Sequence, residues 1–210
     1  MRAALLILLA SSPALALGSI EGEGRVSIQG GYRWSPDDHF EQAAAAAGNP
    51  IVRKSWGGLQ GSAGFGYGAL EWLEAAIDLF GGWESFDLDG YARFHSVSYG
   101  AMLGARFVAR DLFFQGFQPW IGVQVGPTII NISTASFGIP ETVVAGLAVS
   151  GGVMFRFGDR FALTLEARYL MARGMVPGIG GLNGGGGWFS VGFAMFFAPS
   201  MKRDLPVPGF

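Results

Sequence analysis

Apolar and polar residues alternate with a period of two along most of the chain. In residues 25–34, for example, Val26 and Ile28 alternate with Ser27 and Gln29. Successive side chains of a β-strand point to opposite faces, so this pattern predicts strands with one apolar and one polar face. It recurs in eight segments: 25–34, 57–68, 71–81, 95–107, 117–126, 143–157, 161–169 and 188–197.

The chain is strongly apolar, yet its sequence predicts no membrane helix. Half of the 210 residues are hydrophobic, but no segment beyond the N-terminus has about 18 uninterrupted apolar residues. The 35 glycines and the aromatic share of 14% favour strands over helices. A chain that spans lipid must pair every backbone amide, so without helices it must form a closed barrel. We therefore predict an all-β fold, a single closed antiparallel up-and-down transmembrane β-barrel of about eight strands.

The connections between these segments are alternately short and long. Residues 68–70 and 158–160 are short turns. Four connections are predicted to be long loops: 35–56, 82–94, 133–141 and 172–187. Barrels of the outer membrane have short periplasmic turns and long outer loops, which predicts that both termini are periplasmic. Only the connection 108–116 is longer than this rule expects for a periplasmic turn.

Aromatic residues on the apolar faces fall into two groups when the strands run alternately up and down. One group lies at the expected periplasmic end: Tyr67, Phe107, Phe117, Phe157, Phe161 and Phe197. The other lies toward the outer end: Tyr32, Trp34, Trp83, Tyr169 and Phe189. Aromatic girdles at both membrane interfaces are typical of transmembrane barrels, and a soluble β-sandwich has no reason to produce them.

The N-terminus has the pattern of a secretory signal peptide. Arg2 precedes the apolar run 3–10, Pro13 interrupts that run, and Ala14 and Ala16 offer a small-x-small cleavage site. The run is too short for a membrane anchor, which needs about 20 residues. We predict three parts: a signal peptide over 1–18 cleaved between about Ala16 and Gly18, a barrel over 19–197, and a short disordered periplasmic tail over 198–210.

Cysteine content and net charge exclude two further possibilities. The sequence has no cysteine, so it has neither a disulfide nor the attachment residue of a lipoprotein. Its net charge of -2 gives no case for nucleic acid as a partner, because nucleic-acid-binding proteins carry a basic surface.

Charged residues lie on the polar faces, which point into the predicted barrel. In segment 71–81 this face is predicted to hold Trp72 beside its two acids. The interior of an eight-stranded barrel is only wide enough for side chains to fill, and charges enclosed there must pair. We expect an ion-pair network that stiffens and plugs the barrel, and the alternative is a narrow polar conduit. The inward charges are Arg25, Arg33, Glu74, Asp78, Arg106, Arg156, Glu166 and Arg168.

Other residues that could carry chemistry give weaker signals. His39 follows Ser35, Asp37 and Asp38, but adjacent loop residues rarely supply a hydrolase triad, and the group has no further metal ligands. His95 and Ser96 are neighbours on a strand, so they face opposite sides and cannot cooperate.

The glycine-rich connection also lacks a phosphate-binding motif. No Lys-Ser or Lys-Thr pair follows the glycines of 174–187, so we interpret this segment as a flexible loop. We predict no catalytic residue, no metal and no cofactor.

Three segments resemble the family of small outer-membrane β-barrels of the OmpA-barrel, OmpX and OmpW kind. They are QPWIGVQVG at 118–126, LEARY at 165–169 and SVGFAMFF at 190–197. The last looks like the C-terminal insertion signal read by the barrel assembly machinery, although here the chain continues past Phe197. The resemblance implies a location in the Gram-negative outer membrane. It also implies contact with outer-membrane lipid and lipopolysaccharide, and a possible surface partner for the long outer loops.

This family includes membrane-stabilising and adhesive barrels, narrow channels and a few lipid A-modifying enzymes. The deacylase type has a His-x-Ser pair, whereas Val97 stands two positions after His95. The palmitoyltransferase type has an N-terminal amphipathic helix, for which 19–24 is too short. We predict a non-enzymatic integral outer-membrane barrel with a structural or surface-interaction role. The alternative is a narrow channel for small or apolar solutes, and a lipid A-modifying enzyme comes third.

Overall fold

The computed structural model describes residues 19–35, 57–86, 94–134, 138–176 and 180–197. The predicted signal peptide, the predicted tail and the connection with His39 lie outside these residues, so those predictions stay untested. Of the other three predicted long loops, residues 87–93, 135–137 and 177–179 lie outside the described part. Within the described part no helix is long and apolar enough to cross a membrane.

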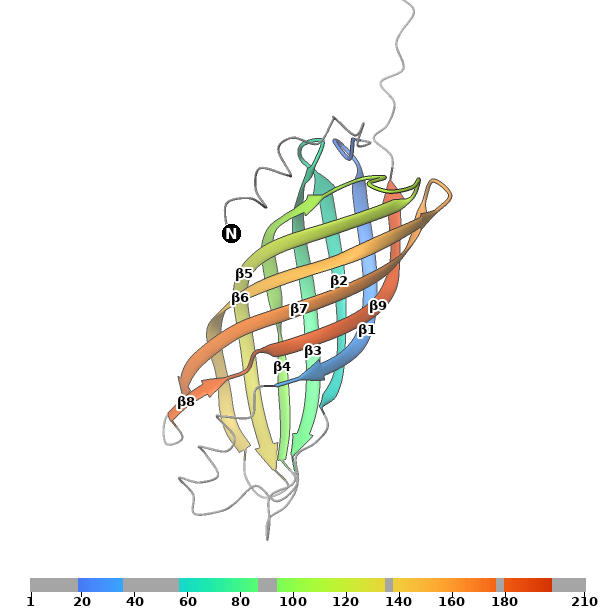
Figure 1. The fold of residues 1–210 in the computed structure, drawn as a ribbon. Helices are drawn as coiled ribbons and strands as arrows, with labels where there is room; N and C mark the ends of the chain where they lie inside the picture. Colours follow the sequence, from blue (N-terminus) through green and yellow to red (C-terminus); the bar gives the residue numbers. More distant parts are fainter. Residues whose placement is uncertain (1–18, 36–56, 87–93, 135–137, 177–179, 198–210) are drawn as a thin grey trace, which may run out of the picture.

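The described residues form a closed antiparallel barrel of eight strands, drawn in Figure 1. Each strand pairs with its neighbour in the chain, and the last strand pairs with both β7 and β1, which closes the ring. A ninth, short strand, β8, pairs with β7 as a hairpin beside this ring. The strands are β1 (Gly24–Trp34), β2 (Gly58–Gly68), β3 (Leu73–Phe86), β4 (Phe94–Val108), β5 (Phe117–Thr134), β6 (Gly138–Phe157), β7 (Phe161–Val176), β8 (Gly180–Asn183) and β9 (Gly186–Phe197). The predicted up-and-down barrel is confirmed.

The two ends of the barrel differ. One end, called here the turn end, carries the short β2–β3 and β6–β7 connections and the start of β1. Gly24 pairs with Phe197 there, so the chain enters and leaves the barrel at this end. The opposite end, called the loop end, carries the connections that lie partly outside the described residues.

Several predicted loops at the loop end are wrong in part, because strands continue through them. β3 reaches Phe86, β5 reaches Thr134, β6 begins at Gly138 and β7 reaches Val176. The glycine-rich segment 174–187 was interpreted as a flexible loop, but it contains β8, which pairs with β7, and the start of β9. These extensions lack a clean alternation of apolar and polar residues. They are strands because ladder hydrogen bonds to a neighbouring strand pair their backbone groups. A register shift between Ile130 and Ile132 marks the irregular part of the β5–β6 ladder.

The outer wall of the barrel is apolar. Ile28, Leu103 and Phe193 expose 67%, 59% and 60% of their surface, which in a soluble protein would be costly. Most of the predicted girdle residues, such as Tyr67, are exposed on this wall. One predicted inward residue is misplaced: Trp72 is 49% exposed and stacks on Phe107. β3 begins only at Leu73, so Trp72 belongs to the turn, where strand alternation does not apply.

Candidate functional site

The candidate site is the lumen, where the structure places the predicted charges. Seven of the eight side chains are 1–5% exposed: Arg25, Arg33, Glu74, Asp78, Arg106, Glu166 and Arg168. Arg156 lies at the turn end with a side chain that is 8% exposed. Strand alternation explains this, because residues two or four apart on a strand share a face. Glu74 and Asp78 on β3 are one such pair, and Glu166 and Arg168 on β7 are another.

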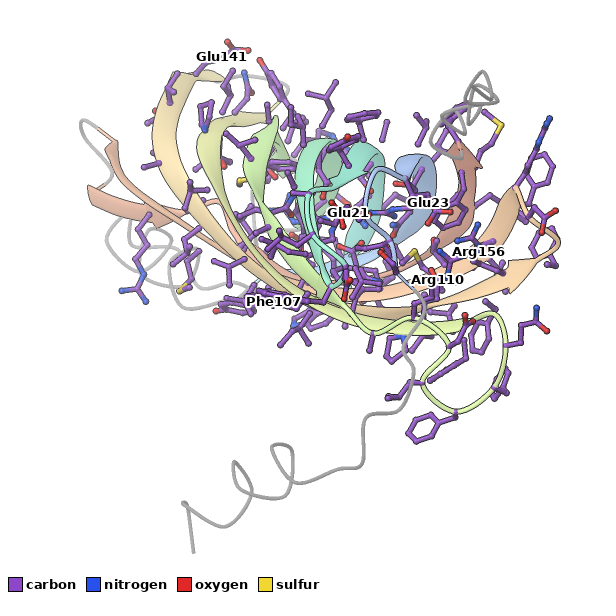
Figure 2. All side chains as sticks on the ribbon, turned by 90° about the horizontal axis from the view of Figure 1, so that it is seen from above. Glu21, Glu23, Phe107, Arg110, Glu141 and Arg156 are labelled. Atoms are coloured by element: carbon purple, nitrogen blue, oxygen red, sulfur yellow. The ribbon has the colours of Figure 1, made fainter. Side chains whose placement is uncertain are left out.

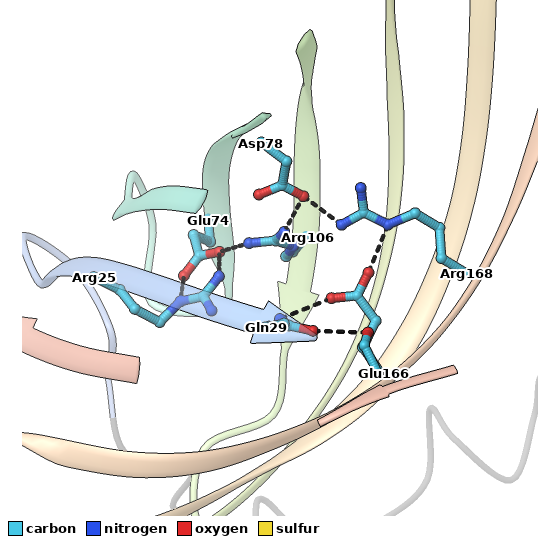
Figure 3. A network of polar contacts seen from close by, with 8 residues as sticks. Arg25, Gln29, Glu74, Asp78, Arg106, Glu166 and Arg168 are labelled. Carbon is cyan, nitrogen blue, oxygen red and sulfur yellow. Dashed lines mark hydrogen bonds and ion pairs between the residues drawn. The ribbon is translucent and has the colours of Figure 1, made fainter. Parts of the chain in front are cut away.

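The centre of the lumen holds a continuous chain of ion pairs, shown in Figure 3. Arg25 donates to both carboxylate oxygens of Glu74, through Nε at 2.9 Å and Nη2 at 2.6 Å. Arg106 donates to Glu74 Oε1 at 3.0 Å through Nη1 and to Asp78 Oδ2 at 2.6 Å through Nη2. Glu74 is therefore shared between two guanidinium groups, one from β1 and one from β4.

The chain continues across the lumen to β7 and β9. Arg168 donates to Asp78 and, through Nε at 2.6 Å, to Glu166 Oε1. Gln29 donates to Glu166 Oε2 at 3.0 Å and accepts a hydrogen bond of the same length from Ser190. Three arginines thus alternate with three carboxylates, so the network is neutral as a whole. We name Arg25, Glu74, Arg106, Asp78, Arg168 and Glu166 the central network.

Two glycines of β2 make room for the central network. A Cβ on Gly66 would lie about 2.6 Å from both carboxylate oxygens of Glu74. A Cβ on Gly64 would lie 3.0 Å from Ser27 Oγ and closer still to Asp78. Real Cβ atoms essentially never approach so closely, so the acids reach the arginines only because β2 has no side chains at these two inward positions.

A second cluster at the turn end was not predicted. Residues 19–23 fold back against the mouth of the barrel, and Ile20 is 5% exposed among Val108, Trp120 and Met154. Backbone hydrogen bonds hold this segment: Ile20 donates to Glu71, and Gly22 donates to Gly68. A side chain at Gly68 would collide with the Ile20 carbonyl.

Ion pairs of Glu23 also hold residues 19–23 against the barrel. Arg156 Nη1 lies 2.8 Å from Glu23 Oε1, and Arg110 Nη1 lies 3.8 Å from Oε2. Arg110 also donates to the Ser19 carbonyl at 2.6 Å. Figure 2 shows Glu23, Arg110 and Arg156 together at this end. We call residues 19–23 the N-terminal stopper. An apolar residue just before the first strand was the only signal for it, and the pairing with Arg156 is non-local.

A third polar cluster lies at the loop end around Arg33. Arg33 Nη2 donates to the carbonyls of Gly184 at 2.8 Å and Gly185 at 3.2 Å, and Nη1 donates to Ser98. The Arg33 Nε atom lies 4.0 Å from Glu84. Glu84 is 2% exposed, and it was not predicted to face the lumen because it lies beyond the predicted end of its strand.

Apolar side chains fill the lumen on either side of the central network. Phe80, Met102, Ile130, Leu170 and Trp188 form a buried cluster toward the loop end. Ile20, Val108, Trp120, Met154 and Phe196 form another toward the turn end. Two tryptophans cover the network itself: the Arg106 guanidinium lies 4.9 Å from the Trp120 ring centroid, and that of Arg168 lies 5.5 Å from the Trp188 ring centroid. These distances are within the range of cation–π attraction.

The space left between these groups is small. A cavity of about 10 Å³ lies between the stopper and the central network, beside Ile20, Glu23, Glu74 and Gln118. That volume is about the minimum that holds one water molecule. Both polar atoms of the Gln118 side chain are buried without a hydrogen-bond partner among the described residues. Most charged groups in the lumen are therefore paired, whereas some of its neutral polar groups have no hydrogen-bond partner among the described residues.

The histidine of the described residues, His95, lies on β4 near the loop end. The His95 ring stacks on Trp83 with centroids 5.7 Å apart, while Ser96 is 2% exposed. The two side chains thus lie on opposite faces, as expected. No three of the described His, Asp or Glu side chains are grouped so that they could hold a metal ion.

No protein-family model matches the sequence, and a search of curated proteins finds no match. Solved structures do match. The outer membrane protein OprG from Pseudomonas aeruginosa has a TM-score of 0.59 at 14% identity, covering 86% of this chain and 98% of that chain. Neisserial surface protein A has a TM-score of 0.55 at 16% identity, covering 84% and 100%.

The attachment invasion locus protein Ail of Yersinia pestis has a TM-score of 0.53 at 13% identity, covering 85% of this chain and 100% of that chain. This chain has the fold of the small outer-membrane β-barrels. At such identities the likeness shows the fold alone, because one fold can carry many functions.

Proposed function

We propose that this protein is an integral outer-membrane barrel with a structural or surface-interaction role, and that side chains plug its lumen. The turn end then faces the periplasm and the loop end faces outward. The exposed apolar wall and the similarity to solved outer-membrane barrels support this location.

The observation that carries the proposal is the central network. Its three positive and three negative side chains donate hydrogen bonds to and accept them from one another. These paired groups fill the centre of the lumen and do not line an open path. Buried clusters of apolar side chains lie on both sides of the central network. An ion on this route would have to break buried ion pairs and also pass close-packed apolar side chains, both of which are costly.

The proposed surface-interaction role is supported by the loop end of the barrel. Outer connections that join long strands are the part of such a barrel that meets other molecules. Ail, one of the similar structures, was solved in complex with the heparin analogue sucrose octasulfate. We infer that the loop end of this chain also meets a ligand at the cell surface.

A narrow channel is the second candidate, favoured by the unpaired amide of Gln118 and the small cavity beside it. Conductance of the purified, refolded protein in a planar bilayer separates the two. We expect no steps from a preparation that is shown to be folded. Reproducible small steps that change in the Arg106→Ala or Glu74→Ala variant would overturn the plugged lumen. Lipid A mass spectra with and without the protein test for a modifying enzyme.

A further inference from the structure

The β4–β5 connection at the turn end is long and apolar. It runs from Ala109 to Gly116, and Phe113 and Phe114 near its tip expose 77% and 58% of their surface. Two adjacent phenylalanines this exposed are unusual outside an interface. Seen from above in Figure 2, the connection extends sideways from the barrel wall. We call residues 109–116 the aromatic finger.

Hydrogen bonds hold the aromatic finger in one shape. Gly116 donates from its backbone to Asp111 Oδ1 at 2.6 Å, and the Arg156 amide donates to the Gly116 carbonyl at 2.8 Å. The backbone of Asp111 has a φ of 58°, in the left-handed region that Asp adopts more readily than most residues. Arg110 ties the base of the finger to the N-terminal stopper through Ser19. The exposed rings are thus presented by a defined structure.

The rings of the finger continue the apolar wall of the barrel. The ring of Phe117, at the start of β5, lies 5.6 Å from that of Phe113 and 5.1 Å from that of Phe114, measured between centroids. On its other side Phe117 contacts the ring of Phe155 on β6 at 5.5 Å. The exposed tip is therefore joined to the lipid-facing surface without a polar break.

A groove beside the base of the finger extends the same surface. It has a volume of about 390 Å³ and is lined mainly by apolar side chains, among them Trp72, Phe107, Pro119 and Ile121. Trp72 and Phe107 form its stacked wall, with centroids 5.4 Å apart. What covers the outer wall of a membrane barrel is lipid, and the groove and the finger are parts of that wall.

We propose that the aromatic finger is an interfacial anchor that inserts Phe113 and Phe114 among the phospholipids of the periplasmic leaflet. This inference rests on the proposed location of the barrel in the outer membrane. Phenylalanine on a surface element at the headgroup boundary buries apolar area in the acyl region, which holds the element to the membrane. The finger then sets the depth of the barrel at its turn end, where the other turns are short.

The absence of cysteine from the sequence allows a direct test with single spin labels. Four variants are refolded into vesicles of phosphatidylethanolamine and phosphatidylglycerol: Phe113→Cys, Phe114→Cys, Leu103→Cys and Asp159→Cys. Leu103 on the lipid-facing wall is the lipid reference, and exposed Asp159 in the β6–β7 turn is the water reference at the same end. Paramagnetic resonance then measures accessibility of each label to oxygen and to a water-soluble nickel chelate.

The finger labels are expected to lie between the two references, with an oxygen-to-nickel accessibility ratio below that of the Leu103 label but several-fold above that at 159. Labels at 113 and 114 that match the 159 label, while the 103 label stays in lipid, would overturn the anchor and leave the barrel in the membrane. Finger labels shielded from both reagents would instead show a protein contact, which also overturns it. A 103 label in water would reject the proposed location itself.

Discussion

Arg106 lies directly opposite Glu74 in the β3–β4 ladder, and its Nη1 donates to Glu74 Oε1 at 3.0 Å. The same guanidinium reaches Asp78, four residues along β3, at 2.6 Å. One arginine therefore joins the two acids of one strand face, and Arg25 and Arg168 complete their pairing from the other sides. This arrangement makes Arg106 the middle of the central network.

Replacing Arg106 with methionine is expected to lower the free energy of unfolding by about 3–5 kcal/mol, because two buried carboxylates each lose a partner. Denaturant unfolding of the barrel from lipid vesicles measures the effect. Arg160→Met is the control: Arg160 is exposed in the β6–β7 turn, and its replacement should change stability by less than about 0.5 kcal/mol. Equal effects of the two variants would show that the central network adds nothing to stability.

Gly66→Ala tests whether the central network requires a glycine on β2 beside Glu74. The new methyl group would lie about 2.6 Å from both oxygens of Glu74, which two arginines hold in place. We expect a loss of about 1–3 kcal/mol from overpacking in the same unfolding measurement. Gly61→Ala is the matched control on the same strand, because its Cβ would lie 3.8 Å from the nearest atom, the Gln29 carbonyl oxygen. A Gly66→Ala variant as stable as Gly61→Ala would contradict the close fit.

The N-terminal stopper should control access to the lumen from the turn end. Gln118→Cys places the only thiol of the chain beside the cavity that Ile20 and Glu23 also line. We expect this thiol to react slowly with a small water-soluble reagent. Adding Ile20→Gly and Glu23→Gln should raise the rate by at least about tenfold, because opening of the mouth then breaks fewer contacts.

The matched comparison for the stopper is Glu21→Gln, at an exposed position of the same turn. This change should leave the thiol rate as it is. If the Ile20→Gly and Glu23→Gln changes also leave the rate as it is, the lumen is reached by another route and residues 19–23 do not close it.

Alternation predicted the strands and the inward side of the charges, because strand geometry fixes the face of every second residue. Together with the lack of a long apolar run and the two groups of aromatic residues, it predicted the barrel. It could not predict which charges meet. Arg25 pairs with Glu74 across 49 residues of sequence, over the glycines of β2, which lies between their two strands. Arg168 pairs with Asp78 across 90 residues and from the other side of the lumen, so that contact depends on the curvature of the closed sheet. The misplaced Trp72 and the missed Glu84 have one cause: strand ends depend on pairing with neighbours, which a local pattern does not show.

Arginine at a lipid-facing position tests the membrane placement itself. Leu103 is 59% exposed and lies midway on β4 between Tyr99 and Phe107. If lipid covers this wall, Leu103→Arg should cost about 2–4 kcal/mol of stability in vesicles, because the charge lies near the bilayer midplane. Tyr99→Arg, nearer the loop end of the same strand, should cost only about 0–1 kcal/mol. In water an exposed arginine costs nothing comparable, so two equally mild variants would mean that this apolar wall is not buried in a bilayer.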